Sequence, residues 1–236
     1  MSPGPPPQGA PVPADGALPP EALAGSAGRP FGVYVHVPFC VTRCGYCDFN
    51  TYTATELGPG ATRESYAGQA IEEIRQARKV LGAAARPAST VFFGGGTPTL
   101  LPPADLAAIL AAIDGEFGLA PGAEVTAEAN PETVDLQALV ELRAGGVTRV
   151  SIGMQSAVSH VLAVLDRKHQ PGRPEKCVAW ARSAGFEHVS LDLIYGTPGE
   201  SDEDWNASLR SAVAAGPVLA VQNRQHVADR ALHADR

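Results

Sequence analysis

The sequence predicts an α/β protein built as a partial, parallel β/α barrel. Two observations predict this fold: strand-like segments alternate with helical segments five times, and polar residues gather where the strand-like segments end. Parallel neighbours need long crossover connections, which the helical segments between them supply. The length of 236 residues suits one large domain or two small ones.

Five segments have the composition of buried strands. They are rich in β-branched and aromatic residues, and Gly, Pro or Asn lies at or just after the end of each. The expected strands are 32–37, 89–93, 124–129, 147–153 and 188–194. The first stops at Pro38, and the second stops at the glycine triplet 94–96.

The segments between the strands carry the signals of helices. Ile71, Ile74 and Ala77 recur at helical spacing among charged residues. Asn130-Pro131-Glu132 is expected to open a helix, with Asn as the cap and Pro in the first turn. That helix is expected to end at Gly145-Gly146. Ile71, Ile74 and Ala77 belong to the expected helix 63–81. The remaining expected helices are 104–113, a weaker stretch at 157–166, 174–184 and 202–215.

Three regions are expected along the chain. Residues 1–30 hold nine prolines among many Gly and Ala, which predicts a disordered arm. Residues 31–219 form the core, and residues 220–236 are an aberrant polar tail. A sixth strand is expected after the last helix, but no segment there has a convincing strand pattern.

Charge and hydropathy exclude several classes of partner. The net charge is −7, so no general attraction draws the chain to nucleic acid or to acidic lipid. No apolar run is long enough for a transmembrane segment, and the first thirty residues lack a secretory signal. We therefore expect a cytoplasmic location, where clustered cysteines favour metal or redox chemistry over disulfides.

The strongest chemical signal is the cysteine motif Cys40-x3-Cys44-x2-Cys47, directly after the first strand. Thiolates are soft ligands that suit an iron–sulfur cluster or zinc. A structural zinc site usually has four ligands, whereas three thiolates can hold a 4Fe-4S cluster and leave one iron open. Zinc and three incidental loop cysteines are the alternatives.

The motif, with Tyr46 before its last cysteine, resembles the signature of the radical S-adenosylmethionine (SAM) superfamily. The segments YVHVPFC (34–40), GGGTPT (94–99) and DLIYG (192–196) resemble the oxygen-independent coproporphyrinogen III oxidase family, and the resemblance covers 31–219. Phe49 stands where the oxidase branch carries a fourth cysteine, which resembles the HemW-type haem chaperones. Because family members run well beyond residue 236, the resemblance implies C-terminal truncation, with the last strand and a C-terminal domain missing.

The resemblance also implies a set of site residues, and many of them lie at or beyond the carboxyl ends of the expected strands. The cluster ligands would be Cys40, Cys44 and Cys47, and the contacts of a first SAM would include Tyr34, Tyr46, Gly95 and Glu128. Gly96, Thr97, Gln155, Arg167 and Asp192 match contacts of a second SAM in the oxidase branch. No catalytic residue is expected.

Each of these residues has a plainer interpretation. The glycine triplet suits a tight turn, Glu128 an exposed strand-end acid, and Arg167 or Asp192 a structural ion pair or a surface charge. His36 could ligate haem, accept a proton or be a hydrogen-bonded core histidine. Cys177 is expected to be a small buried hydrophobe.

By resemblance, the chain would bind a 4Fe-4S cluster and SAM, take haem as cargo and pass it to an apo-haemoprotein, with an electron donor serving the cluster. The alternative is an enzyme of porphyrin biosynthesis, an oxygen-independent coproporphyrinogen III dehydrogenase that uses a 5′-deoxyadenosyl radical. An inactive fragment of either protein is a third possibility. The sequence leaves open whether the chain is an enzyme.

Overall fold

The computed structural model describes residues 11, 13–53, 62–216 and 219–223. Its centre is one sheet of six parallel strands, in which each strand lies beside its neighbour in sequence. The strands are β1 (Gly32–Val37), β2 (Ala88–Gly95), β3 (Leu119–Ala129), β4 (Arg149–Gln155), β5 (His188–Ile194) and β6 (Leu219–Asn223). The predicted α/β class and the five βα units are confirmed.

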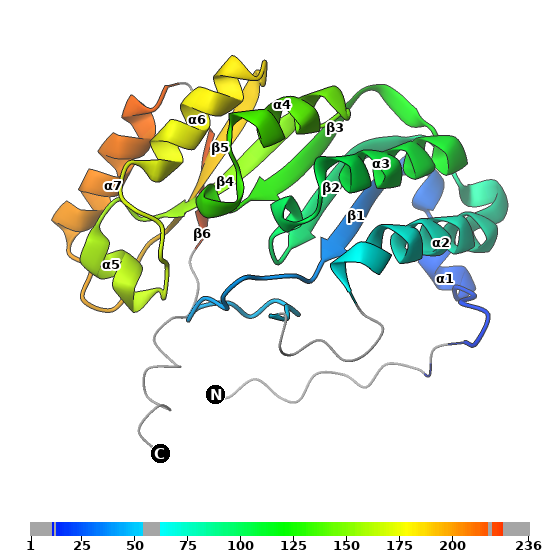
Figure 1. The fold of residues 1–236 in the computed structure, drawn as a ribbon. Coiled ribbons are helices and arrows are strands. Elements are labelled where there is room, and N and C mark those ends of the chain that lie inside the picture. The colour runs from blue at the N-terminus through cyan, green and yellow to red at the C-terminus, as the bar shows by residue number, and fades with distance from the viewer. Residues whose placement is uncertain (1–10, 12, 54–61, 217–218, 224–236) are drawn as a thin grey trace.

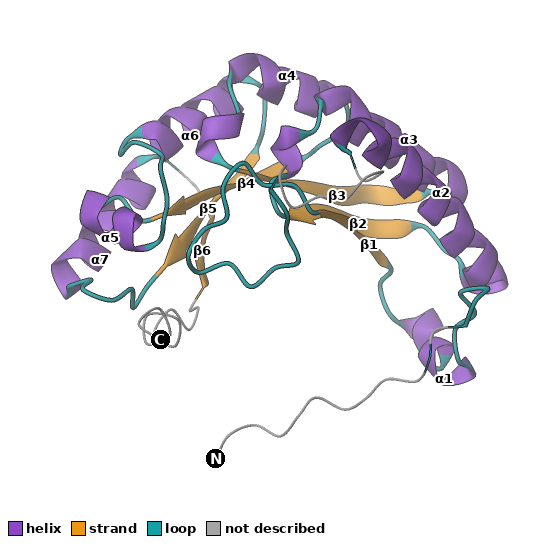
Figure 2. Ribbon diagram, turned by 60° about the horizontal axis from the view of Figure 1, so that its bottom comes forward, coloured by secondary structure: helices purple, strands orange, loops and turns teal. Residues whose placement is uncertain are grey.

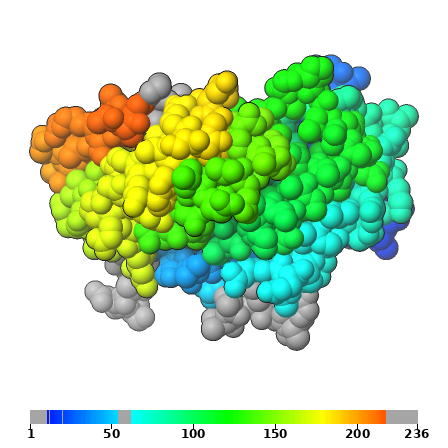
Figure 3. Space-filling view, turned by 45° about the horizontal axis from the view of Figure 1, so that its top comes forward, coloured from blue at the N-terminus to red at the C-terminus, as the bar shows by residue number. Residues whose placement is uncertain are grey.

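Helices cover the convex face of this curved sheet. They are α2 (Arg63–Leu81), α3 (Pro103–Phe117), α4 (Leu136–Ala144), α5 (Ser159–Val164), α6 (Arg173–Ser183) and α7 (Asp202–Ala214). Figures 1 and 2 show the helices outside the arc of strands, and Figure 3 shows this outer face, on which the colours of α2, α3, α4, α6 and α7 succeed one another. Among the described residues, α2 to α7 thus lie on one side of the sheet and do not cover its concave face.

The hydrophobic core lies between the sheet and the helices. Phe93 and Ile152 point outward from their strands and are fully buried against helical residues such as Ile109 and Leu139. Because successive strand residues point to opposite faces, the alternate residues of these strands face the concave side.

No helix among the described residues is long and apolar enough to cross a membrane.

β1, α2 and β5 begin and end where the sequence predicts, but the helix expected from Asn130 does not. Asn130 instead caps a 3₁₀ turn, Pro131–Thr133, by accepting a hydrogen bond from the Glu132 N–H at 3.1 Å. The α-helix α4 starts later because Asp135 caps it, accepting from the Ala138 N–H at 2.8 Å. Two capping residues in succession therefore divide the segment into a 3₁₀ turn and a separate α-helix.

The prediction that the last strand is missing is wrong. β6 pairs in parallel with β5, from Ser190 opposite Leu219 to Ile194 opposite Asn223. An unpaired edge of β5 would leave its backbone N–H and C=O groups without partners, and this short segment satisfies them. Its sequence, Leu-Ala-Val-Gln-Asn, is too short and too polar at one end to stand out as a strand. The rest of the predicted polar tail, 224–236, lies outside the described residues.

The N-terminal arm is described only in part, since residues 1–10 and 12 lie outside the described residues. The described part contains a short helix, α1 (Pro20–Leu23), and a 3₁₀ turn, Ser26–Gly28. It contacts α2 through the carbonyl oxygen of Asp15, which accepts a hydrogen bond from Gln76 Nε2 at 2.9 Å. Prolines near the start of α1 are compatible with this short helix because they fix φ at a helical value.

Candidate functional site

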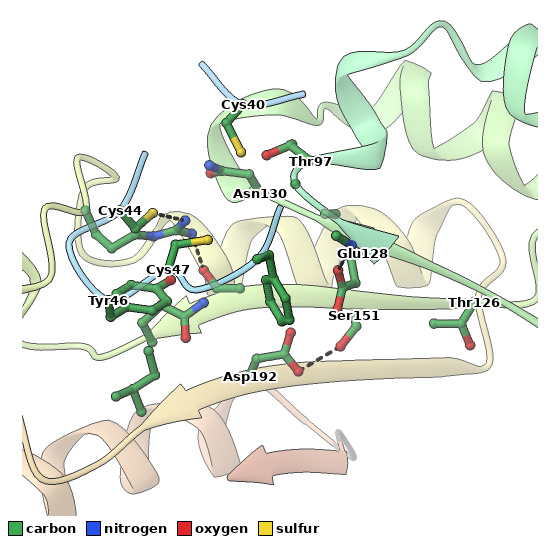
Figure 4. Close-up of a pocket in the computed structure, with 18 of the residues that line it drawn as sticks. Cys40, Cys44, Tyr46, Cys47, Thr97, Thr126, Glu128, Asn130, Ser151 and Asp192 are labelled. Carbon is green, nitrogen blue, oxygen red and sulfur yellow. Dashed lines mark hydrogen bonds between the residues drawn. The ribbon is translucent and has the colours of Figure 1, made fainter. Parts of the chain in front are cut away.

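A cavity of about 390 Å³ opens on the concave face, at the carboxyl ends of the strands. β2, β3, β4 and β5 supply its floor, and the loop after β1 supplies one wall (Figure 4). All but one of the predicted site residues line it: Cys40, Cys44, Tyr46, Cys47, Gly95, Gly96, Thr97, Glu128, Gln155, Arg167 and Asp192. Residues up to 152 apart in the sequence therefore meet in one place.

Tyr34 is the predicted site residue that does not line this cavity. It lies on β1 with 56% of its surface exposed, and it lines a separate groove between β1 and α2. Its ring stacks on Phe92, which does line the cavity, at 6.1 Å between centroids. Its hydroxyl is 2.9 Å from His36 Nδ1. Tyr34 is thus connected to the cavity through its ring contact with Phe92.

The cysteine loop is tied to the barrel at its base and in its middle. At the base, the Cys40 N–H donates to the Tyr52 carbonyl at 3.0 Å, and the Tyr52 N–H donates to the Pro38 carbonyl at 2.7 Å. In the middle, the Gly45 N–H donates to the Leu165 carbonyl, next to α5, at 3.3 Å. These bonds hold the loop against the rim of the cavity.

The three loop thiols are half-buried and face hydrogen-bond donors. Cys40 lies beside Thr97, while Cys44 and Cys47 lie together across the cavity (Figure 4). Burial raises the pKa of the Cys40 thiol, and hydrogen bonds from threonine hydroxyls oppose that rise. Arg167 Nη1 donates to Cys44 Sγ at 3.5 Å. Donors of this kind stabilise thiolates, which are the form that binds metal.

The donor set fits an iron–sulfur cluster. Three soft thiol ligands line one cavity, and no disulfide engages Cys40, Cys44 or Cys47. Within the described ranges, no three His, Cys, Asp or Glu side chains gather closely enough to hold a single metal ion. An iron–sulfur cluster takes thiolates on several of its irons, and three thiols on one loop are donors of the kind that it binds.

The glycine triplet brings the β2 strand end against the cysteine loop. A Cβ on Gly96 would lie 2.5 Å from the Phe39 carbonyl oxygen, and one on Gly95 would lie 2.6 Å from the His36 ring. Gly95 also has φ +106°, which side chains rarely adopt. The glycines therefore allow a close approach of two protein segments, and this is more than a plain turn requires.

Glu128 is a half-buried carboxyl in the wall of the cavity, which excludes the exposed-acid interpretation. Its Oε2 accepts a hydrogen bond from the Gly95 N–H at 3.1 Å. Burial, together with the nearby Asp192, raises the pKa of Glu128 to about 7, and the Gly95 N–H opposes the rise. A positively charged ligand in the cavity would favour the ionised form of Glu128.

Arg167 and Gln155 sit where β4 is distorted. Arg167 Nη2 donates to the Gly153 carbonyl at 2.8 Å, so this guanidinium joins β4 to the cysteine loop. Gln155 has φ +63°, and the pairing of β4 with β5 shifts register between Gly153 and Gln155. Strained residues of this kind concentrate at functional sites. Arg167 is half-buried, so a surface charge does not describe it.

The structure adds cavity residues that the sequence analysis missed. They include Phe92, Thr126, Asn130, Arg149 and Ser151. The signal was present in the strands, because polar residues alternate with apolar ones in Glu124-Val125-Thr126-Ala127-Glu128 and in Arg149-Val150-Ser151. A strand with both faces buried by apolar groups would not alternate in this way.

His36 and Cys177 have structural partners. His36 Nε2 is 2.8 Å from the Asn50 carbonyl oxygen, so both ring nitrogens of this half-buried histidine make hydrogen bonds. Cys177 is fully buried in the hydrophobic core on α6, as predicted, and lies away from the cavity.

Comparison with known proteins places this geometry in a family. The family model for the radical SAM superfamily matches residues 34–212. The haem chaperone HemW of Mycobacterium tuberculosis is 52% identical over 194 residues, which are 82% of this chain and 49% of that protein. HemW of Escherichia coli is 35% identical over 188 residues, 80% of this chain and 48% of that protein. The chain thus spans about half the length of the curated relatives it matches.

Among solved structures, the coproporphyrinogen III oxidase HemN of Escherichia coli has a TM-score of 0.72 and 27% identity. That match covers 85% of this chain and 46% of HemN. The match of the superfamily model to most of the chain, together with these relatives, shows that the chain belongs to the radical SAM superfamily, within its HemN/HemW-like family.

Proposed function

We propose that this chain is the SAM-domain portion of a HemW-type haem chaperone. It binds a 4Fe-4S cluster through Cys40, Cys44 and Cys47, binds SAM in the adjoining cavity, and serves the delivery of haem to apo-haemoproteins. The observation that carries the proposal is that three thiols from one loop share a cavity with the Glu128 carboxyl and the glycine triplet. The 52% identity to a haem chaperone supports the choice of cargo.

Each part of the cavity would have its own task. The three thiolates would hold three irons, and Arg167 and Thr97 would stabilise the sulfur charges by donating hydrogen bonds. Glu128 and Asp192 would accept hydrogen bonds from the hydroxyl and ammonium groups of SAM, which carries positive charge. When bound, the cluster would supply one-electron redox chemistry and an open iron position, fed by an external electron donor.

The similarity to HemN supports a second candidate, an oxygen-independent coproporphyrinogen III dehydrogenase. The two candidates differ in what happens to the tetrapyrrole: a chaperone releases haem unchanged, whereas the dehydrogenase converts propionate side chains of its substrate. Phe49, at the position where the oxidase branch carries a fourth cysteine, favours the chaperone.

Anaerobic reconstitution with iron and sulfide tests the cofactor part. We expect about four irons per chain in the unmodified protein. Cys44→Ala should lose the cluster absorbance, whereas the matched variant Cys177→Ala should keep it, because Cys177 lies in the core. Equal loss of iron in both variants would overturn the cluster assignment.

The cargo part is tested by titrating the reconstituted chain with haem and adding apomyoglobin as an acceptor. We expect a haem-bound absorbance spectrum that shifts to that of myoglobin after mixing. A parallel anaerobic incubation with coproporphyrinogen III, SAM and a reductant should leave the porphyrinogen unchanged. Decarboxylated product would favour the dehydrogenase, and failure to bind haem would refute the chaperone proposal for this portion of the protein.

A further inference from the structure

A continuous chain of hydrogen bonds runs along the floor of the cavity between β4 and β5. Arg149 Nη2 donates to Ser190 Oγ at 3.3 Å, Ser190 Oγ donates to Ser151 Oγ at 2.9 Å, and Ser151 Oγ donates to Asp192 Oδ1 at 2.8 Å. Figure 4 shows the last of these bonds, with Asp192 rising from β5 toward the cavity. We call these four residues the serine relay.

Strand register places the relay on the concave face. Ser151 is opposite Ser190, and Gly153 is opposite Asp192, so the side chains of β4 and β5 form a diagonal row. Both serines are buried, with Ser190 at 0% exposure, so water does not replace their hydrogen bonds. A buried hydroxyl that loses its hydrogen-bond partner destabilises the fold, so burial holds the relay in this arrangement.

The chemistry of the two ends fixes the direction of the relay. A guanidinium can only donate hydrogen bonds, and an ionised carboxylate can only accept them. The two serines between them must each accept from the arginine side and donate toward Asp192. A protonated Asp192 could place its own O–H against Ser151, which would conflict with this direction. The relay therefore favours the ionised form of Asp192, whose Oδ1 accepts the hydrogen bond from Ser151. Burial raises the pKa of Asp192, and this hydrogen bond opposes that rise.

Arg149 is itself fixed at the far end. Its Nη1 donates to Glu124 Oε2 at 3.4 Å, and Glu124 also accepts a hydrogen bond from Thr126 Oγ1 at 3.1 Å. Residues on β3, β4 and β5 thus determine where Arg149 lies. The hydrogen bonds of the relay in turn fix the position of the Asp192 carboxylate. Asp192 also shares the cavity with Glu128 and Arg167.

We propose that Arg149, acting through Ser190 and Ser151, is a positioning residue that orients the Asp192 carboxylate toward a ligand presenting hydroxyl or ammonium donors. This inference rests on the proposed function, in which SAM occupies the cavity, and it adds residues to which the family resemblance assigned no role. Arg149 acts by fixing the rotamer and ionisation of Asp192, so its effect requires an ionisable side chain at position 192.

The test measures SAM affinity by equilibrium dialysis with the reconstituted chain. Arg149→Met and Ser151→Ala should each weaken SAM binding about tenfold, the equivalent of one charge-assisted hydrogen bond. Ser208→Ala is the matched control, since Ser208 is also fully buried and hydrogen-bonded but lies outside the relay; it should change the affinity less than twofold. In an Asp192→Asn background, Arg149→Met should have little further effect, because the two act as a unit.

A second measurement does not depend on SAM. Carbon-13 NMR of the Asp192 carboxyl in the unloaded chain should show its titration midpoint rising in Arg149→Met and in Ser151→Ala, but not in Ser208→Ala. The charged groups facing Asp192 are Glu128, Arg149 and Arg167. The relay would be overturned by a midpoint that does not move. It would also be overturned if Arg149→Met cost as much affinity in the Asp192→Asn background as in the unmodified chain.

The two experiments separate this inference from the proposed function. If the unmodified chain binds no SAM, the proposed function fails, and the carboxyl titration still decides whether the relay operates. If Asp192→Asn weakens SAM binding while Arg149→Met does not, the site stands and the relay is wrong.

Discussion

Replacing Glu128 by Gln should make the protein more stable at neutral and alkaline pH. Glu128 has an ordinary pKa of 4.5, and burial in the folded protein raises that pKa to about 7. Because the folded state binds the proton more tightly, unfolding releases it between these two values, and stability falls as the pH rises from about 4.5 to about 7. The carboxyl thus costs the folded state most above pH 7.

The size of this effect follows from the two pKa values. Their difference of about 2.5, at 1.36 kcal/mol per pKa unit, corresponds to about 3 kcal/mol. Glutamine has nearly the same shape, is neutral at every pH and can still accept the hydrogen bond from the Gly95 N–H. We therefore expect Glu128→Gln to match the unmodified protein near pH 4.5 and to exceed its free energy of unfolding by up to about 3 kcal/mol at pH 8.

Urea unfolding followed by circular dichroism between pH 4.5 and pH 8 checks this expectation. The quantity to plot is the difference between variant and unmodified protein, because the contributions of groups that do not interact with Glu128 cancel in it. Glu187→Gln, which alters an exposed carboxyl, is the control and should give a small, flat difference. A flat difference for Glu128→Gln as well would refute the argument that burial controls this carboxyl.

Three further substitutions test a close approach at the site, a helix cap and the packing of the core. Gly96→Ala would place a Cβ against the Phe39 carbonyl oxygen, so urea unfolding should show a loss of about 1–3 kcal/mol; an unchanged midpoint would contradict the close approach. Asp135→Ala removes the cap of α4 and should cost about 1 kcal/mol in the same assay, whereas an effect below 0.3 kcal/mol, on the order of experimental error, would count against the cap. Cys177→Ala leaves a small void in the core and should lower the thermal midpoint by a few degrees without altering the iron content of the reconstituted protein.

The sequence alone determined the elements whose signals are local. A strand such as β1 or β5 is recognised by its own composition and by the Pro or Gly near its end, and α2 is recognised by apolar residues three and four apart. The cysteine motif is local as well, because the spacing of three cysteines within eight residues is read directly from the sequence. The family resemblance followed from these same short segments.

The tertiary structure alone decided which distant residues meet. Glu128 and Asp192 influence each other, and Arg149 connects to Asp192 through two serines, because sheet curvature and strand register bring β3, β4 and β5 together on the concave face. β6 was not predicted because its own residues carry a weak strand signal. It is stabilised by its pairing with the edge of β5. Sequence periodicity records which side of an element is apolar, whereas the pairing of elements depends on backbone contacts between segments far apart in the chain.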